Sequence, residues 1–126
     1  MSSADPFTVG HDPERALIVV TMRDFWTVET VDAYGAALGP VIGAALSAGG
    51  PVALLIDCTA YPVQSAAVAE RFVTLAATFP PPSPDGVRAV AIVVGSMLNK
   101  MQAQRTFGPM VTIFTDHDEA AASLMG

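Results

Sequence analysis

The sequence predicts an α/β fold, in which buried strands alternate with helices along the chain. Three short apolar runs, Leu17 to Met22, Val52 to Asp57 and Val87 to Val94, are rich in Val, Ile and Leu and have no regular polar face. Such runs are typical of strands buried on both faces, and hence of a largely parallel sheet with helices packed above and below it. Ala-rich stretches with helical spacing separate the runs, as this architecture requires.

The chain is expected to open with an antiparallel hairpin. Residues 7–10 and 16–22 flank the polar turn His-Asp-Pro-Glu at 11–14, where proline suits a position that needs no N–H donor. A long helix should follow, beginning at the N-cap Thr27 and ending at Gly49-Gly50. Residues 52–56 then form the expected central strand.

Strand and helix then alternate to the end of the chain. A second helix follows Ser65 and stops at the prolines of 80–84, and residues 87–94 form the next strand. A third helix spans Met97 to Phe107, a short strand spans residues 111–114, and Asp116 caps a last helix. The predicted order is β-β-α-β-α-β-α-β-α, a mixed four- to five-stranded sheet flanked by about four helices. At 126 residues this is the size of one domain, residues 1–126.

Charge excludes some classes of partner. The net charge is −6, from 12 acidic and 6 basic residues, so no basic stripe is left to neutralise phosphates and we expect no nucleic-acid partner. Charged residues make up only 14% of the chain, against a usual share of about 25%. The low share favours an apolar patch covered by a second subunit, so a homodimer is expected. The cations are scattered and do not indicate an anionic membrane surface: they are Arg15, Arg23, Arg71, Arg88, Lys100 and Arg105.

We expect the protein to be cytoplasmic. Cys58 is the single cysteine, so no internal disulfide can form, and the N-terminus shows no signal-peptide pattern. Residues 33–56 carry no charge, but Pro40 and the Gly-Gly-Pro at 49–51 divide them into a helix and a strand. No transmembrane segment is therefore predicted.

Several segments resemble the STAS superfamily, the domain of anti-sigma-factor antagonists and sulfate-transporter tails, and most closely its sporulation-antagonist-like (SpoIIAA-like) branch. They are Leu54-Leu55-Ile56-Asp57 leading into a loop and helix, the strand from Arg88 to Gly95, and Phe114 to Ala120 with Leu124 four residues later. Their order and spacing span nearly the whole chain. The resemblance implies a mixed sheet flanked by helices and a regulatory or binding module that works without a cofactor.

The resemblance also singles out Ser65. Some members of the family take a phosphate on a serine in an Asp-Ser-Ser-Gly sequence at the start of the second helix, and this chain has Gln-Ser-Ala-Ala at 64–67 instead. Counted from Asp57, Ala66 falls at the acceptor position, and Ser65 is the candidate phosphoacceptor only if the loop is one residue shorter. A plain N-cap of the second helix is the favoured interpretation of Ser65.

Catalysis and metal binding find little support. Asp57 and Cys58 end a central strand at the edge where open α/β sheets place ligands, but neither His11 nor His117 is placed near them to activate the thiol. A small buried cysteine is favoured, and we predict no catalytic residue. The acidic residues around His117 suit the start of a helix better than a metal site, because consecutive helical side chains diverge.

Methionines gather around the third helix. The favoured interpretation is that these methionines lie on the apolar side of the helix and pack into the core. The alternative is that the third helix is a mobile lid over an apolar groove beside the second helix, suited to an acyl chain or a partner helix. The candidate ligand-binding residues are Met97, Leu98, Met101, Phe107 and Phe72. The predicted function is a non-enzymatic interaction or regulatory module, and the alternative is a protein that binds lipid or a small apolar ligand.

Overall fold

The computed structural model describes residues 5–79, 83–107 and 111–125, and its elements follow the predicted order. The strands are β1 (Phe7–Asp12), β2 (Leu17–Arg23), β3 (Val52–Ala60), β4 (Val87–Val94) and β5 (Thr112–Phe114). The helices are α1 (Val28–Ser47), α2 (Ala66–Ala76), α3 (Met97–Phe107) and α4 (His117–Met125).

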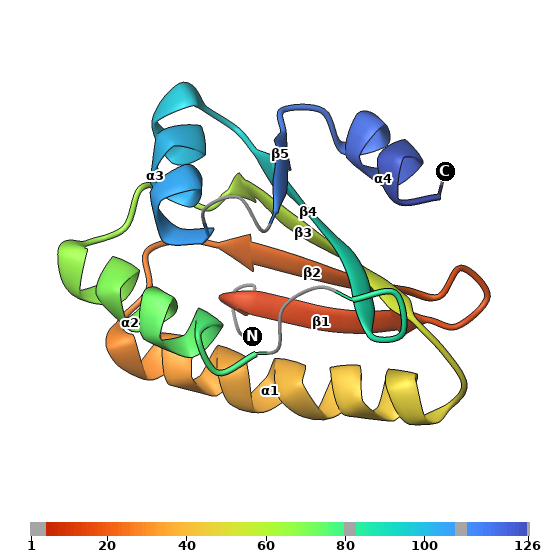
Figure 1. Cartoon of the computed structure of the whole chain (residues 1–126). Helices are drawn as coiled ribbons and strands as arrows, with labels where there is room; N and C mark the ends of the chain where they lie inside the picture. Colours follow the sequence, from red (N-terminus) through yellow and green to blue (C-terminus); the bar gives the residue numbers. More distant parts are fainter. Residues whose placement is uncertain (1–4, 80–82, 108–110, 126) are drawn as a thin grey trace.

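The strands form one five-stranded sheet in the order β1-β2-β3-β4-β5. β1 and β2 pair antiparallel, which confirms the predicted hairpin, although β1 runs on to Asp12 and Ala16 takes a positive φ of 52° before β2. β2, β3, β4 and β5 are mutually parallel. Each parallel crossover steps to the next strand in the same direction, and right-handed crossovers then put α1, α2 and α3 on one face of the sheet (Figure 1).

Helices cover the two faces of the sheet unequally. The larger core lies between the sheet and α1, α2 and α3, and includes Val20, Ile56, Tyr34 and Phe72. The smaller core lies on the opposite face under α4, where Leu124 and Ala120 pack among Leu17, Ala53, Leu55, Ala91 and Val93. The prediction of helices on both faces is therefore confirmed, with α4 covering the second face within the described residues.

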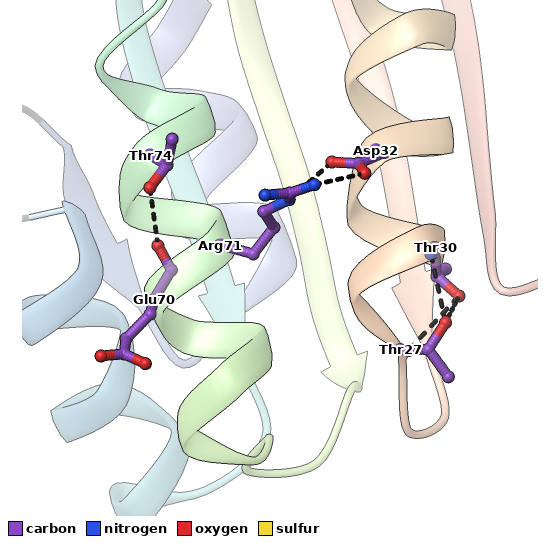
Figure 2. A network of polar contacts seen from close by, with 6 residues as sticks. All are labelled: Thr27, Thr30, Asp32, Glu70, Arg71 and Thr74. Carbon is purple, nitrogen blue, oxygen red and sulfur yellow. Dashed lines mark hydrogen bonds and ion pairs between the residues drawn. The ribbon is translucent and has the colours of Figure 1, made fainter.

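Side chains fix the starts of the four helices. The Thr27 hydroxyl accepts the Thr30 N–H at 3.2 Å, and the Thr30 hydroxyl accepts the Thr27 N–H, which closes a capping box on α1 (Figure 2). Ser65, Ser96 and Asp116 each accept a backbone N–H as the N-caps of α2, α3 and α4. The N-caps predicted from the sequence are confirmed, and α1 continues as one helix through Pro40.

α1 and α2 approach each other closely. A Cβ on Gly35 would lie 2.6 Å from a Leu75 methyl, so only glycine allows this separation without movement. Across the same pair of helices the Arg71 guanidinium donates two hydrogen bonds of 2.8 Å to the Asp32 carboxylate (Figure 2). These hydrogen bonds hold the pKa of Asp32 below its ordinary value.

The described residues include no helix that is both long and apolar enough to span a lipid bilayer.

Candidate functional site

The strongest candidate site lies at the carboxyl edge of the sheet, where β2, β3 and β4 end. Open α/β sheets bind ligands and partners at this edge, because the loops there converge. The β2–α1 loop, the β3–α2 loop and α3 meet around a shallow surface depression. Its lining is Asp24, Phe25, Thr59, Ala60, Tyr61, Pro62 and Asn99.

Large apolar side chains are exposed on the two loops and on α3. Phe25 is 76% exposed on the β2–α1 loop, and Val63 is exposed on the β3–α2 loop. On α3, Met97, Leu98 and Met101 are 70%, 67% and 48% exposed. We call these five residues the carboxyl-edge surface. Among the described residues the other large hydrophobic side chain with comparable exposure is Val73, on α2.

The sequence predicted that the apolar side of α3 faces the core, and this prediction was wrong. Met97, Leu98 and Met101 point outward, and the residues of α3 that face the protein are Asn99, Gln102 and Ala103. Core filling by these methionines is therefore contradicted.

Two amide side chains replace apolar packing as the anchor of α3. Asn99 Nδ2 donates a hydrogen bond to the Tyr61 carbonyl. The side-chain amide of Gln102 accepts the Gln64 N–H at 3.0 Å and donates to the Gln64 carbonyl at 3.1 Å. Both backbone groups of Gln64 are therefore bonded by one side chain. The helix is thus tied to the β3–α2 loop by polar contacts, and its apolar side chains are left free to face outward.

Gln64 connects this anchor to the β2–α1 loop. It is 8% exposed, its Oε1 accepts the Trp26 N–H at 2.7 Å, and its Nε2 donates to the carbonyls of Asp24 at 3.1 Å and Pro62 at 2.8 Å. Both amide protons and the amide oxygen are therefore satisfied, as a buried amide requires. One side chain holds together the two loops that carry Phe25 and Val63.

The backbone of the edge is shaped by two local features. Asp24 takes a positive φ of 66° after an irregularity in β2, and its N–H donates to the Ala60 carbonyl at 3.1 Å. Asp57 accepts hydrogen bonds from the Thr59 N–H at 2.9 Å and the Thr59 hydroxyl at 2.7 Å. Asp57 therefore shapes the end of β3.

A small cavity of about 40 Å³ lies between α2, α3 and the sheet. Phe72 lines it, but Met97, Leu98 and Met101 do not, and the side chain of Phe107 lies outside the described side chains. Of the four candidate ligand residues whose side chains the structure describes, Phe72 alone lines this cavity. The cavity is lined by Met22, Cys58, Tyr61, Gln64, Val68, Ala69, Phe72, Ile92, Val94, Asn99, Gln102 and Ala103.

The cavity adjoins an aromatic cluster centred on Trp26. The Trp26 ring lies 5.5 Å from Phe72 in a stacked arrangement and 5.1 Å from Tyr61 edge to face, measured between ring centroids. Its indole N–H donates to the carbonyls of Arg23 and Pro6. The buried hydroxyl of Tyr61 has no hydrogen-bond partner among the described residues. Trp26 is the single tryptophan of the chain, so its fluorescence reports on this region.

Cys58 lies in an environment that suppresses thiol chemistry. It is buried, its Sγ contacts Met22 Sδ at 3.8 Å, and burial together with the nearby charge of Asp57 raises its pKa to about 12. A catalytic thiol needs the opposite shift. His11 lies in β1 and His117 begins α4, and no group of three potential metal ligands converges among the described residues.

The Ser65 hydroxyl accepts the Val68 N–H at 3.3 Å. Its role as the N-cap of α2 is therefore confirmed, and its role as a phosphoacceptor stays a prediction.

Part of this site was missed from the sequence. Gln64 is a lone glutamine between a strand and a helix, and no local pattern marks it. Asn99, Gln102 and Ala103 do carry a signal, because positions i, i+3 and i+4 share one face of a helix. Hydrophobicity nevertheless assigned the opposite face of α3 to the core.

Comparison of the sequence with protein-family models and with curated proteins finds no match. The structure, in contrast, is similar to an anti-sigma factor antagonist from Mycobacterium paratuberculosis, with a TM-score of 0.66, 17% identity and full coverage of both chains. It is also similar to an uncharacterized DUF3478-family protein with a SpoIIAA-like fold from Shewanella loihica PV-4, with a TM-score of 0.62, 20% identity and 98% coverage of both chains. The chain therefore has the SpoIIAA-like fold, as its resemblance to the STAS superfamily implied.

Proposed function

We propose that the chain is a cytoplasmic, non-enzymatic regulatory module that binds another protein through its carboxyl-edge surface. The observation that carries the proposal is the exposure of large apolar side chains on the two loops and the helix that meet at that edge, namely Phe25, Val63, Met97, Leu98 and Met101. Contiguous exposed apolar patches on soluble proteins mark interaction sites. Scattered single residues would need no such explanation.

The support beneath this surface favours binding over folding as its role. Gln64, Gln102 and Asn99 hold the loops and α3 by hydrogen bonds, so the apolar side chains above them are not needed to anchor these segments. Residues held on a fixed frame lose less entropy when a partner binds. Similarity to an anti-sigma factor antagonist agrees with a regulatory module whose partner is a protein.

The suppressed reactivity of Cys58 argues against the competing enzyme hypothesis. A thiol whose pKa is raised to about 12 stays protonated near neutral pH. Asp57 is engaged with Thr59 in the turn that follows β3. Neither group is arranged as a nucleophile with its base.

Affinity capture with matched variants tests the proposal. The immobilised protein, Leu98→Asp and Val73→Asp are exposed to extract from the native organism, and bound proteins are quantified by mass spectrometry. Both substitutions put a charge in place of an exposed apolar side chain, Leu98 at the edge and Val73 on α2. We expect the wild type and Val73→Asp to capture equal amounts of one partner protein. Leu98→Asp should capture about tenfold less of it, as expected when an interface hot spot is lost.

Two results would count against this function. One is the absence of any protein retained above the level of an unrelated bait. The other is a captured protein that Leu98→Asp retains as well as the wild type does, because its binding site would then lie elsewhere.

A second candidate function is the binding of a small apolar ligand beside α3. The mainly apolar cavity next to Phe72 favours it, as does the Tyr61 hydroxyl, which finds no hydrogen-bond partner within the described part of the chain. At about 40 Å³ the cavity is well below the roughly 150 Å³ that accommodates benzene, so an acyl chain would enter only after α3 had moved.

Native mass spectrometry of the freshly purified protein separates these functions. A discrete additional mass on each subunit, released by Phe72→Asp, would favour the ligand. The same spectrum tests the proposed homodimer, which rests on the low share of charged residues, 14% of the chain.

A further inference from the structure

The outward face of α3 combines apolar and positively charged side chains. Met97, Leu98, Met101 and Arg105 follow one another at spacings of one, three and four residues, so they lie along one side of the helix. Lys100 borders this stripe, three residues after Met97. The opposite side of the helix carries Asn99, Gln102 and Ala103, which face the protein. We call Met97, Leu98, Lys100, Met101 and Arg105 the α3 face.

The charge of this face differs from that of the whole chain. The protein carries 12 acidic and 6 basic residues, whereas the sequence of α3 contains Lys100 and Arg105 and no acidic residue. Neither cation forms an ion pair with another side chain in the part of the chain that the structure describes. Arg71 of α2, by comparison, is neutralised by Asp32. α3 itself therefore carries two positive charges and no negative charge, in a protein whose net charge is −6.

We propose that the α3 face docks an acidic amphipathic helix of the partner protein. This inference rests on the proposed function and specifies the partner's chemistry. Apolar side chains of the partner helix pack against Met97, Leu98 and Met101, and its Glu or Asp side chains pair with Lys100 and Arg105. Binding of an amphipathic helix by a surface with methionine and leucine anchors is a recurrent mode of recognition, and methionines adapt to the shape of the helix that they contact.

The charge count favours a protein helix over an anionic membrane. Electrostatic recognition of anionic lipid uses clusters of about four to eight cations, and the α3 face has two. A flat anionic surface would also approach the remaining charges of a chain with a net charge of −6. A single helix contacts a smaller area and can be confined to the α3 face.

A second copy of this chain is the less favoured occupant. The first turn of α4 carries Asp118 and Glu119, whose charge is complementary to Lys100 and Arg105 in the α3 face of another molecule. That contact would join two different surfaces, and such contacts tend to propagate into open chains instead of a closed dimer.

An NMR titration tests the proposal with defined probes. The ¹⁵N-labelled full chain is titrated with a designed helical peptide of about five turns, with Leu on one face and Glu on the other, and with its counterpart in which every Glu is Lys. We expect the Glu peptide to shift amide signals along α3 and to bind at least about tenfold more tightly than the Lys peptide. Its affinity should fall between about 0.1 and 1 M salt, where the screening length decreases from about 10 to about 3 Å.

Charge-reversal variants assign the effect to the α3 face. Arg105→Glu and Lys100→Glu should each weaken binding of the Glu peptide by about tenfold, whereas Arg15→Glu should leave it unchanged. Arg15 lies in the β1–β2 turn and is exposed, so its reversal makes the same change in net charge away from α3.

The peptide titration would overturn the inference if the two peptides bound equally or if the signal changes mapped away from α3. Two further results would also overturn it. One is co-sedimentation of the protein with anionic vesicles that Arg105→Glu abolishes, and the other is self-association that Arg105→Glu abolishes. The proposed function is judged separately. A partner that is captured through Leu98 but keeps its affinity in Arg105→Glu would uphold that function and reject the acidic helix.

Discussion

At the scale of single residues, Gln64 contributes most to the shape of the candidate site. Its side chain makes three hydrogen bonds to main-chain groups of two loops, and its own backbone makes two more to Gln102. A buried amide with every polar atom paired is stable in place, but removal of the amide leaves several main-chain groups without partners.

Replacement of Gln64 by leucine should therefore destabilise the protein strongly. The Trp26 N–H and the Asp24 and Pro62 carbonyls would lose their partners, and we expect a loss of roughly 2–4 kcal/mol in the free energy of unfolding. Urea denaturation followed by Trp26 fluorescence measures this. Gln104→Leu, at an exposed position of α3, is the matched control and should change the free energy by less than about 0.5 kcal/mol. Similar losses in the two variants would contradict the role assigned to Gln64.

Burial of Cys58 makes the stability of the folded protein decrease at alkaline pH. Burial raises the pKa of the thiol from its ordinary value near 9 to about 12, so between these pH values the unfolded chain releases a proton that the folded chain retains. The stabilising effect is complete below about pH 9 and is lost as the pH rises toward 12. Burial also raises the pKa values of Tyr34 and Tyr61, which adds to the loss at higher pH.

We expect the native thiol to react with iodoacetamide far more slowly than the thiol of the urea-unfolded chain at pH 8. In Cys58→Ala, stability should decline less between pH 8 and 10.5 than in the wild type, as measured by denaturation at each pH. Rapid native alkylation, or the same decline in both proteins, would show that the thiol is not buried as described.

At the scale of elements, the contact between α1 and α2 depends on Gly35. A Cβ at Gly35 would meet Leu75 at 2.6 Å, whereas a Cβ at Gly43, further along the same helix, would meet nothing within 4 Å. Substitution of each glycine by alanine therefore separates the effect on helix propensity, which is common to both, from the steric effect, which arises at Gly35 only.

Gly43→Ala should stabilise the protein by about 0.5–1 kcal/mol, because alanine favours the helix. Gly35→Ala has the same gain in propensity but forces the Leu75 side chain to move, and we expect it to be less stable than Gly43→Ala by about 0.5–1.5 kcal/mol, the cost of a displaced rotamer. Thermal denaturation of both variants tests the difference. Equal stabilisation by the two substitutions would mean that α1 and α2 are not in close contact at Gly35.

The elements also show why the sequence predicted the fold better than the site. Strands such as Val52–Ala60 are apolar throughout, and the caps at Thr27, Ser65 and Asp116 are local, so pattern and spacing determine them. α3 is different, because its position is set by amide groups that bond to main-chain atoms distant in sequence. Hydrophobic periodicity carries no information about such bonds, so it predicted the wrong face of α3 to be buried.

At the scale of the whole molecule, the protein combines a well-packed sheet with a lightly anchored helix. α1 buries Val31, Tyr34, Leu38 and Ala45, whereas Ala103 is the one buried residue among the described side chains of α3. Regions with few buried apolar side chains open locally at lower free energy than the core. We therefore place α3 at the low-stability end of the molecule.

Hydrogen–deuterium exchange should resolve this difference directly. Amides of α3 should exchange at least about tenfold faster than those of α1 and β3, because local opening of α3 needs less free energy than global unfolding. Gln102→Ala should accelerate exchange in α3 while leaving the amides of β3 unchanged. Uniform protection across α1, β3 and α3 would contradict the light anchoring of α3.

At this scale, the outward face of α3 and the neighbouring loops form the proposed binding site for a protein partner. Site-specific photo-cross-linking in the native organism tests it most directly, with a photoreactive amino acid placed at Leu98 in one strain and at Val73 in another. Both positions are exposed and apolar, so non-specific capture affects them equally. We expect one discrete cross-linked protein from position 98 and none from position 73. The same adducts from both positions, or an adduct from position 73 alone, would contradict it.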